Sequence, residues 1–211
     1  AINIMRRLIQ AQGVEVIHLG HNRSVLDIVQ AAIQEDADAI AVSSYQGGHI
    51  EYFKYMVDLL RERGSGHIRV FGGGGGTITP DEIRELEDYG VERIYHPDDG
   101  MNLGLVEMIE DVVERAAESR VATSAPGAID PNNAGSVAAM LSALEDEVFT
   151  EAELALKRRE WQGRGKQAPV VGITGTGGAG KSSVTDELLN RFTQFSPHMK
   201  IAVLAVDPTR R

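Results

Sequence analysis

The chain has 211 residues, of which 42% are apolar and 25% charged, and these proportions are typical of a folded globular protein. It contains no cysteine, which excludes disulfides and thiolate-bound zinc, and no apolar run approaches the roughly 20 residues that cross a bilayer. The net charge of −10 disfavours a nucleic-acid partner, because phosphate binding needs clustered cations. We therefore expect no membrane or nucleic-acid partner and a reducing compartment, the cytoplasm.

The first 118 residues alternate strand-like and helix-like segments with short connections. This pattern predicts a parallel sheet covered by helices on both faces. The predicted strands are 14–20, 38–44, 68–73 and 92–96. The predicted helices start at Ala1, after Ser24, near Ile50, after Thr79 and at Met101, the last ending at Ala117.

Polar and glycine residues gather directly after the predicted strands, in HLGHNRS, SSYQGGH, GGGGGTIT and HPDDG. The segments before the strands, such as QEDAD, are acidic and carry no such mixture. In an open α/β sheet, ligands bind beyond the carboxyl ends of the strands. We therefore expect the site at that edge of the sheet.

Residues 119–135 lose the apolar period and gather Pro, Gly, Ser and Asn, which is the composition of a linker. One long amphipathic helix is expected to follow, from Ser136 to about Arg159. The sequence thus predicts a first domain over 1–118, a linker with a long helix over 119–165, and the beginning of a second domain over 166–211.

Both ends of the sequence indicate a piece of a longer polypeptide. The opening helix has no capping residue and no strand before it, and the first strand of a flavodoxin-like sheet is a central one. At the other end, the expected strands 169–175 and 200–207 enclose one helix, which makes a single β-α-β unit of a larger sheet.

The stretch GITGTGGAGKSS, residues 172–183, satisfies the P-loop pattern G-x-x-x-x-G-K-[ST] between a predicted strand and a predicted helix. Backbone N–H groups of such a loop converge on phosphates, Lys181 would reach the terminal phosphates, and Ser182 would hold Mg²⁺. The alternative is a glycine-rich turn without a ligand. The expected nucleotide-binding residues are Gly175, Gly177, Gly178, Ala179, Gly180, Lys181, Ser182 and Ser183.

Asp207 ends the next predicted strand, and from there its carboxylate would reach the same Mg²⁺ directly or through water. The alternative for Asp207 is a simple turn before Pro208.

Five consecutive glycines, residues 72–76, follow the third predicted strand. They do not form a second P-loop, because no Lys-Ser pair follows and because Thr79 and Glu82 form a capping box that satisfies the N–H groups of the next helix. Without side chains, the run offers a smooth wall along which a bulky ligand can lie. The alternative is a flexible surface loop.

Residues 1–118 resemble the cobalamin-binding module of adenosylcobalamin-dependent acyl-CoA mutases, through QGVEVIHLG, VSSYQGGH, GGGGGTITPDEI and YHPDDG in that order. The resemblance implies a flavodoxin-like domain with a channel for the dimethylbenzimidazole tail of the cofactor. Ser43 would hydrogen-bond that tail, and the other matched residues would border it. The residues implied are Ser43, Ser44, Tyr45, His49, Gly72, Gly73, Gly75 and Gly76.

One detail of this match stays open, and two others depart from the family's pattern. Alignment on the strand favours Gly72 and Gly73 as the glycine pair at the tail, whereas alignment back from Pro80 favours Gly75 and Gly76. The D-x-H motif whose histidine binds cobalt in the family is absent, and the match places that histidine upstream of Ala1. Tyr45 also stands where the family usually has leucine.

Residues 166–211 resemble the G-protein chaperone of such mutases, through VVGITGTGGAGKSS and VLAVDP, with DPT in place of that family's DPS. The order of the parts is similar to that of the fused isobutyryl-CoA mutases. This resemblance implies adenosylcobalamin, GTP and Mg²⁺ as cofactors, and a reversible rearrangement of isobutyryl-CoA to n-butyryl-CoA. It also implies a homodimer, and an acyl-CoA substrate and a guanine that are recognised by residues outside this sequence, which therefore holds no catalytic residue.

Two other interpretations belong to different classes. A non-catalytic cobalamin carrier or sensor would use the same first domain beside a P-loop partner, and a downstream barrel would distinguish the mutase from it. A receiver-like domain joined to a P-loop kinase lacks the clustered aspartates that a receiver needs for Mg²⁺.

Overall fold

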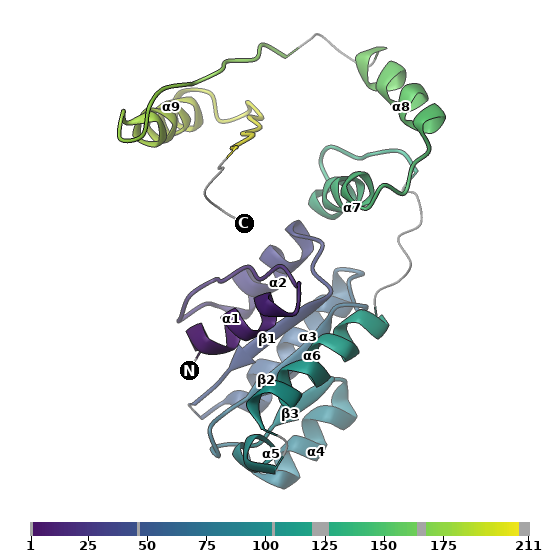
Figure 1. Ribbon diagram of the computed structural model, residues 1–211, viewed down its shortest axis with the longest axis vertical. Helices are drawn as coiled ribbons and strands as arrows, with labels where there is room; N and C mark the ends of the chain where they lie inside the picture. Colours follow the sequence, from purple (N-terminus) through teal and green to yellow (C-terminus); the bar gives the residue numbers. More distant parts are fainter. Residues whose placement is uncertain (1, 46, 103, 120–126, 164–167, 207–211) are drawn as a thin grey trace. The chain divides into compact units, whose positions relative to one another are not determined.

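The computed structural model describes residues 2–45, 47–102, 104–119, 127–163 and 168–206 (Figure 1). They fall into two compact units, Ala1–Leu156 and Lys157–Arg211. In the part of the chain that the structure describes, no helix is both long and apolar enough to cross a bilayer.

The first unit is built on a parallel sheet with the strand order β1-β2-β3. The strands are β1 Ala39–Ser43, β2 Arg69–Gly73 and β3 Arg93–Tyr95. Ser43 pairs with Gly73, and Gly73 pairs with Tyr95, so the carboxyl ends of the strands lie side by side. The α/β class and the parallel sheet are thereby confirmed.

Helices cover both faces of this sheet (Figure 1). They are α1 Ile2–Ala11, α2 Val25–Gln34, α3 His49–Glu62, α4 Pro80–Tyr89, α5 Pro97–Asn102 and α6 Leu105–Ser119. One core lies between the sheet and α2, α3 and α4, and it includes Val29, Ile40 and Phe53. The other lies on the side of α1 and α6 and includes Phe71, Tyr95 and Met108. The residues of α2 that are buried in the first of these cores, Val25, Val29 and Ala32, recur at helical spacing.

Segments 14–20, 169–175 and 200–206, which were predicted as strands, form no strand in the structure. A single extended segment lacks the ladder hydrogen bonds that stabilise a strand, and the described residues offer these segments no neighbouring strand. The apolar residues Val14 and Ile17 of the first segment remain 37% and 46% exposed. These three strand predictions are wrong for this structure.

The long helix expected from Ser136 to Arg159 is two helices, α7 Ala134–Glu145 and α8 Glu151–Gly163. Glu147 adopts a left-handed φ of 53°, and the backbone N–H of Val148 donates to the carbonyl of Ala143 at 3.0 Å, which closes α7. Thr150 then begins α8, because its backbone N–H donates to the Glu153 carboxylate at 2.8 Å. The sequence contains this second capping box, but the continuous apolar spacing favoured a single helix across it.

The helix expected from Met101 to Ala117 is also divided. It is replaced by α5 and α6, with Gly104 at a left-handed φ of 87° directly before α6. Such a φ is natural for glycine and ends the preceding turn.

Helix α7 packs against α2 and belongs to the first unit. A Cβ at Gly135 would lie 3.4 Å from Ile33 Cγ2, and Met140 and Ala143 are 2% and 0% exposed. The first compact unit therefore extends beyond residue 118 into the predicted linker.

Candidate functional site

The carboxyl ends of β1 and β2 leave an open strip on the α1 and α6 side of the sheet. Ala41 and Ser43 are exposed there, although Phe71, on the same face of the neighbouring strand, is only 2% exposed. Ser43 lies in register with Gly73. We call Ala41, Ser43 and Gly73 the open strip. It presents one hydroxyl beside a stretch of bare backbone.

The first two glycines of the run 72–76 face opposite sides of the sheet. A Cβ at Gly72 would overlap Ile94 and lie 2.5 Å from Phe53 Cζ, so this glycine makes room for the α3 side of the core. At Gly73 a Cβ would meet nothing closer than the Tyr95 carbonyl oxygen at 3.5 Å, which is an ordinary contact. The bare backbone of Gly73 is thus available to a ligand, whereas that of Gly72 is covered.

Gly75 and Gly76 have left-handed φ values of 57° and 86°, which glycine adopts without strain. A Cβ at Gly75 would overlap the ring of Tyr45, which is 61% exposed. Tyr45 and Gly75 therefore lie against each other on the surface, and they connect the loop after β1 with the loop after β2.

The same two loops are joined by their backbones. The N–H of Ser44 donates to the carbonyl of Gly73 at 2.8 Å, and within the second loop the N–H of Thr77 donates to the carbonyl of Gly74 at 3.0 Å. A Cβ at Gly74 would lie only 2.6 Å from the carbonyl oxygen of Ser44. The glycine run is thus a tightly packed turn and not a loose surface loop.

His49 does not lie on the open strip. It is 8% exposed, and its Nε2 lies 3.3 Å from Glu82 Oε1 at the start of α4. The other oxygen of Glu82, Oε2, accepts from the backbone N–H and the hydroxyl of Thr79, both at 2.8 Å. The predicted capping box is confirmed, and His49 is its neighbour. Sequence reasoning missed this pair, because capping boxes are local and His49 belongs to another helix.

The environment of Glu82 lowers the pKa of its carboxyl group. The backbone N–H of Thr79 makes the largest contribution, followed by the Thr79 hydroxyl and the weaker effect of His49. Each of these donors favours the ionised carboxylate. At neutral pH Glu82 is therefore an anion that only accepts hydrogen bonds.

This lowered pKa predicts a pH-dependent contribution to stability. A carboxyl group whose pKa is lower in the folded state stabilises the fold above its unfolded pKa, about 4.3, and loses this effect as the pH falls through the folded value. We expect Glu82→Gln to be less stable than the wild type at neutral pH, and the difference to shrink towards acid. Urea unfolding of both proteins across this range measures it. A difference independent of pH would contradict the role of the charge.

The glycine-rich loop of the second unit leads into α9 Lys181–Phe195. Gly180 caps this helix with a left-handed φ of 81° and without a side-chain hydrogen bond, unlike Thr79 at α4. Lys181 Nζ donates to the carbonyls of Gly175 and Thr176 at 2.8 and 2.9 Å. The lysine ammonium thus lies over its own loop, and the first N–H groups of α9 are open to an anion.

The remaining predicted nucleotide residues lie on the same loop. Gly178 has a left-handed φ of 76°, and a Cβ at Gly177 or Gly178 would meet nothing within 4 Å, so this part of the backbone is uncovered. Ser182 and Ser183 follow in the first turn of α9 and are exposed. Asp207, predicted to assist with Mg²⁺, lies outside the described residues.

Comparison with known proteins gives a family for the first unit. The family model for the B12 binding domain matches residues 1–106 of the chain. The chain belongs to the B12-binding domain family. A second family model, that of the methylmalonyl-CoA mutase-associated GTPase MeaB, matches residues 141–211, which include the P-loop and α9.

Individual relatives match the whole chain or part of it. The chain is 55% identical over its whole length to a fused isobutyryl-CoA mutase from Cupriavidus metallidurans, and 52% identical to one from Geobacillus kaustophilus. It spans only 19% and 20% of these two relatives. A glutamate mutase sigma subunit from Clostridium tetani is 33% identical over 48% of the chain and 77% of that subunit.

The open strip of this B12-binding domain has the chemistry that the flat, aromatic tail of a cobalamin requires. Ser43 supplies an exposed hydroxyl, and a side chain at Gly73 would project from the same face into the space beside it. A planar ring can lie against bare backbone only where no Cβ stands in the way. The residues present therefore fit the group that the family name indicates.

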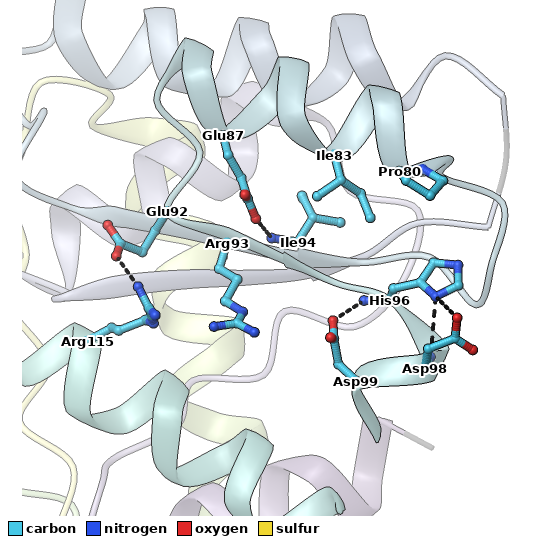
Figure 2. Close-up of a pocket in the computed structure, with 10 residues that line it drawn as sticks. All are labelled: Pro80, Ile83, Glu87, Glu92, Arg93, Ile94, His96, Asp98, Asp99 and Arg115. Carbon is cyan, nitrogen blue, oxygen red and sulfur yellow. Dashed lines mark hydrogen bonds and ion pairs between the residues drawn. The ribbon is translucent and has the colours of Figure 1, made fainter. Parts of the chain in front are cut away.

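A separate cavity of about 440 Å³ lies beside β3 in the B12-binding domain, between α4 and α6 (Figure 2). Figure 2 shows Glu92 turned towards Arg115 and His96 towards Asp98, whereas the carboxylates of Glu87 and Asp99 accept from the backbone N–H groups of Ile94 and His96. Arg115 pairs with Glu92 at 3.2 Å, and His96 Nδ1 lies 3.2 Å from the Asp98 carboxylate. The lining holds the carboxylates of Glu87, Glu92, Asp98 and Asp99 and the guanidinium groups of Arg93 and Arg115, and none of the residues of the open strip.

Proposed function

We propose that this chain is the cobalamin- and nucleotide-binding part of an adenosylcobalamin-dependent mutase that interconverts isobutyryl-CoA and n-butyryl-CoA. One observation carries the proposal: a B12-binding domain and a MeaB-type P-loop segment follow each other here as in the fused isobutyryl-CoA mutases that match the whole chain. The acyl-CoA and the catalytic residues belong to other parts of the protein. The division into 1–118, 119–165 and 166–211 stays a prediction.

In the proposed cofactor site, the hydroxyl of Ser43 donates a hydrogen bond to the dimethylbenzimidazole tail. The backbone of Gly73 forms the wall against which the ring lies, and Ser44 and Gly76 border it together with the exposed Tyr45–Gly75 contact. Gly72 is left out of this set because it faces the core. When bound, adenosylcobalamin supplies the radical that starts the rearrangement, by homolysis of its cobalt–carbon bond.

In the proposed nucleotide site, the loop 175–183 holds GTP. Free N–H groups at the start of α9 face the phosphates, Lys181 neutralises the terminal ones, and Ser182 holds Mg²⁺ with help from Asp207. GTP binding and hydrolysis then control the entry or release of the cofactor. We place this protein in the cytoplasm and expect a homodimer.

The test uses the full-length protein in three assays. Absorbance titration with adenosylcobalamin measures cofactor binding, phosphate release measures GTP hydrolysis, and chromatography of the acyl-CoA pool measures conversion of isobutyryl-CoA to n-butyryl-CoA. We expect all three activities. Cobalamin binding without isomerisation would identify a carrier or sensor instead, and a protein that binds no cobalamin would contradict the proposal entirely.

A further inference from the structure

The pair formed by His49 and Glu82 connects the two loops of the candidate cofactor wall. His49 is the first residue of α3, which follows the loop after β1, and Glu82 lies in the first turn of α4, which follows the loop after β2. The loop before α3 carries Tyr45, and the loop before α4 carries Gly75. The pair therefore joins the starts of the two helices behind these loops.

The chemistry of the pair defines which side of the contact can donate. Glu82 is ionised at neutral pH because Thr79 donates two hydrogen bonds to its Oε2. An ionised carboxylate only accepts, so in the 3.3 Å contact between His49 Nε2 and Glu82 Oε1 the imidazole is the side that can donate. His49 is nearly buried, which protects this polar contact from competition by water.

Two other contacts also connect these two loops. Next to the sheet, the N–H of Ser44 donates to the carbonyl of Gly73, and on the surface Tyr45 lies on Gly75. Without the imidazole of His49, α3 and α4 would keep their apolar packing, but their first turns would lose the polar contact between His49 and Glu82. The loops that precede them would then shift most.

We propose that His49 is a positioning residue, whose polar contact with Glu82 holds the loops after β1 and β2 at the spacing that admits the nucleotide tail of the cofactor. The inference rests on the proposed cobalamin function. It assigns His49 no contact with the cofactor.

The experiment compares two variants. His49→Leu replaces the imidazole with an apolar side chain of similar bulk that has no donor, whereas His49→Gln retains an N–H donor. Both are made in the full-length protein and titrated with cobalamin and with cobinamide, which lacks the nucleotide tail. For His49→Leu we expect cobalamin affinity to fall about tenfold while cobinamide affinity stays within about twofold. His49→Gln should restore most of the cobalamin affinity.

Two further variants separate positioning from general helix packing. Glu82→Gln places an amide donor opposite the donor of His49 and should also weaken cobalamin selectively, so it decides the question if His49→Leu does not fold. Glu85→Gln breaks the Lys54–Glu85 ion pair, which joins the same two helices farther from the loops, and should have no effect on cobalamin.

The outcomes distinguish this proposal from the one on which it rests. A wild-type protein that binds no cobalamin overturns both. A wild type that prefers cobalamin to cobinamide, with His49→Leu and Glu82→Gln retaining that preference, overturns the positioning role alone. Equal losses in Glu85→Gln, or equal losses for both ligands, would also overturn it, because they would indicate a general effect of helix packing.

Discussion

Replacing Lys181 with alanine is expected to abolish GTP binding and to leave cobalamin binding unchanged. Lys181 Nζ donates to the carbonyls of Gly175 and Thr176, so its ammonium is held over the loop that we propose binds the phosphates of GTP. The helix behind it has no side-chain cap, which leaves this charge and the loop N–H groups as the anion-binding elements. Loss of such a charged contact weakens binding by about 100-fold or more.

The matched control for this prediction is Arg191→Gln. Arg191 carries the same charge on the same helix. Its Nε lies 2.7 Å from the carboxylate of Glu187, and this pair does not include the loop. Fluorescent GTP titration of both variants in the full-length protein separates a local role from a change in net charge. Undiminished nucleotide affinity in Lys181→Ala would refute the assignment of the P-loop.

Features encoded by neighbouring residues were predictable from the sequence. The capping box of Thr79 and Glu82 and the cap of Ser24 depend on residues three positions apart, and both form as expected. The strands β1, β2 and β3 were also predicted from local patterns. They form in the structure because each has a neighbouring strand to pair with.

Features that depend on distant partners were not predictable. Residues 14–20 have the apolar and β-branched composition of a strand, yet strand formation depends on a neighbouring strand that a local pattern does not contain. The sequence predicted that His49 borders a ligand. Its contact with Glu82 could not be predicted, because it depends on how α3 and α4 pack. The apolar stripe over 136–159 predicted one helix, because apolar spacing persists through a break that φ at Glu147 and the cap at Thr150 create.

The two alignments of the glycine run differ in a way that the structure makes testable with a single methyl group. At Gly72 the added Cβ would overlap Ile94 and press on Phe53, so Gly72→Ala should destabilise the first unit by about 1–3 kcal/mol in urea unfolding. At Gly73 the Cβ has only an ordinary contact with the Tyr95 carbonyl, and alanine suits a strand better than glycine does. Gly73→Ala should therefore keep or slightly increase the stability.

The cofactor should respond in the opposite order. The methyl group of Gly73→Ala stands on the face of Ser43, where the proposed ring would lie, so we expect cobalamin affinity to fall about tenfold or more while the fold is unchanged. Folded Gly72→Ala should bind nearly normally, since its methyl group points to the other face of the sheet. Each variant is the control for the other, because they differ only in the face that the methyl group occupies. If Gly73→Ala bound cobalamin as the wild type does, the tail would not lie on the open strip, and the pair Gly75 and Gly76 would become the better candidate.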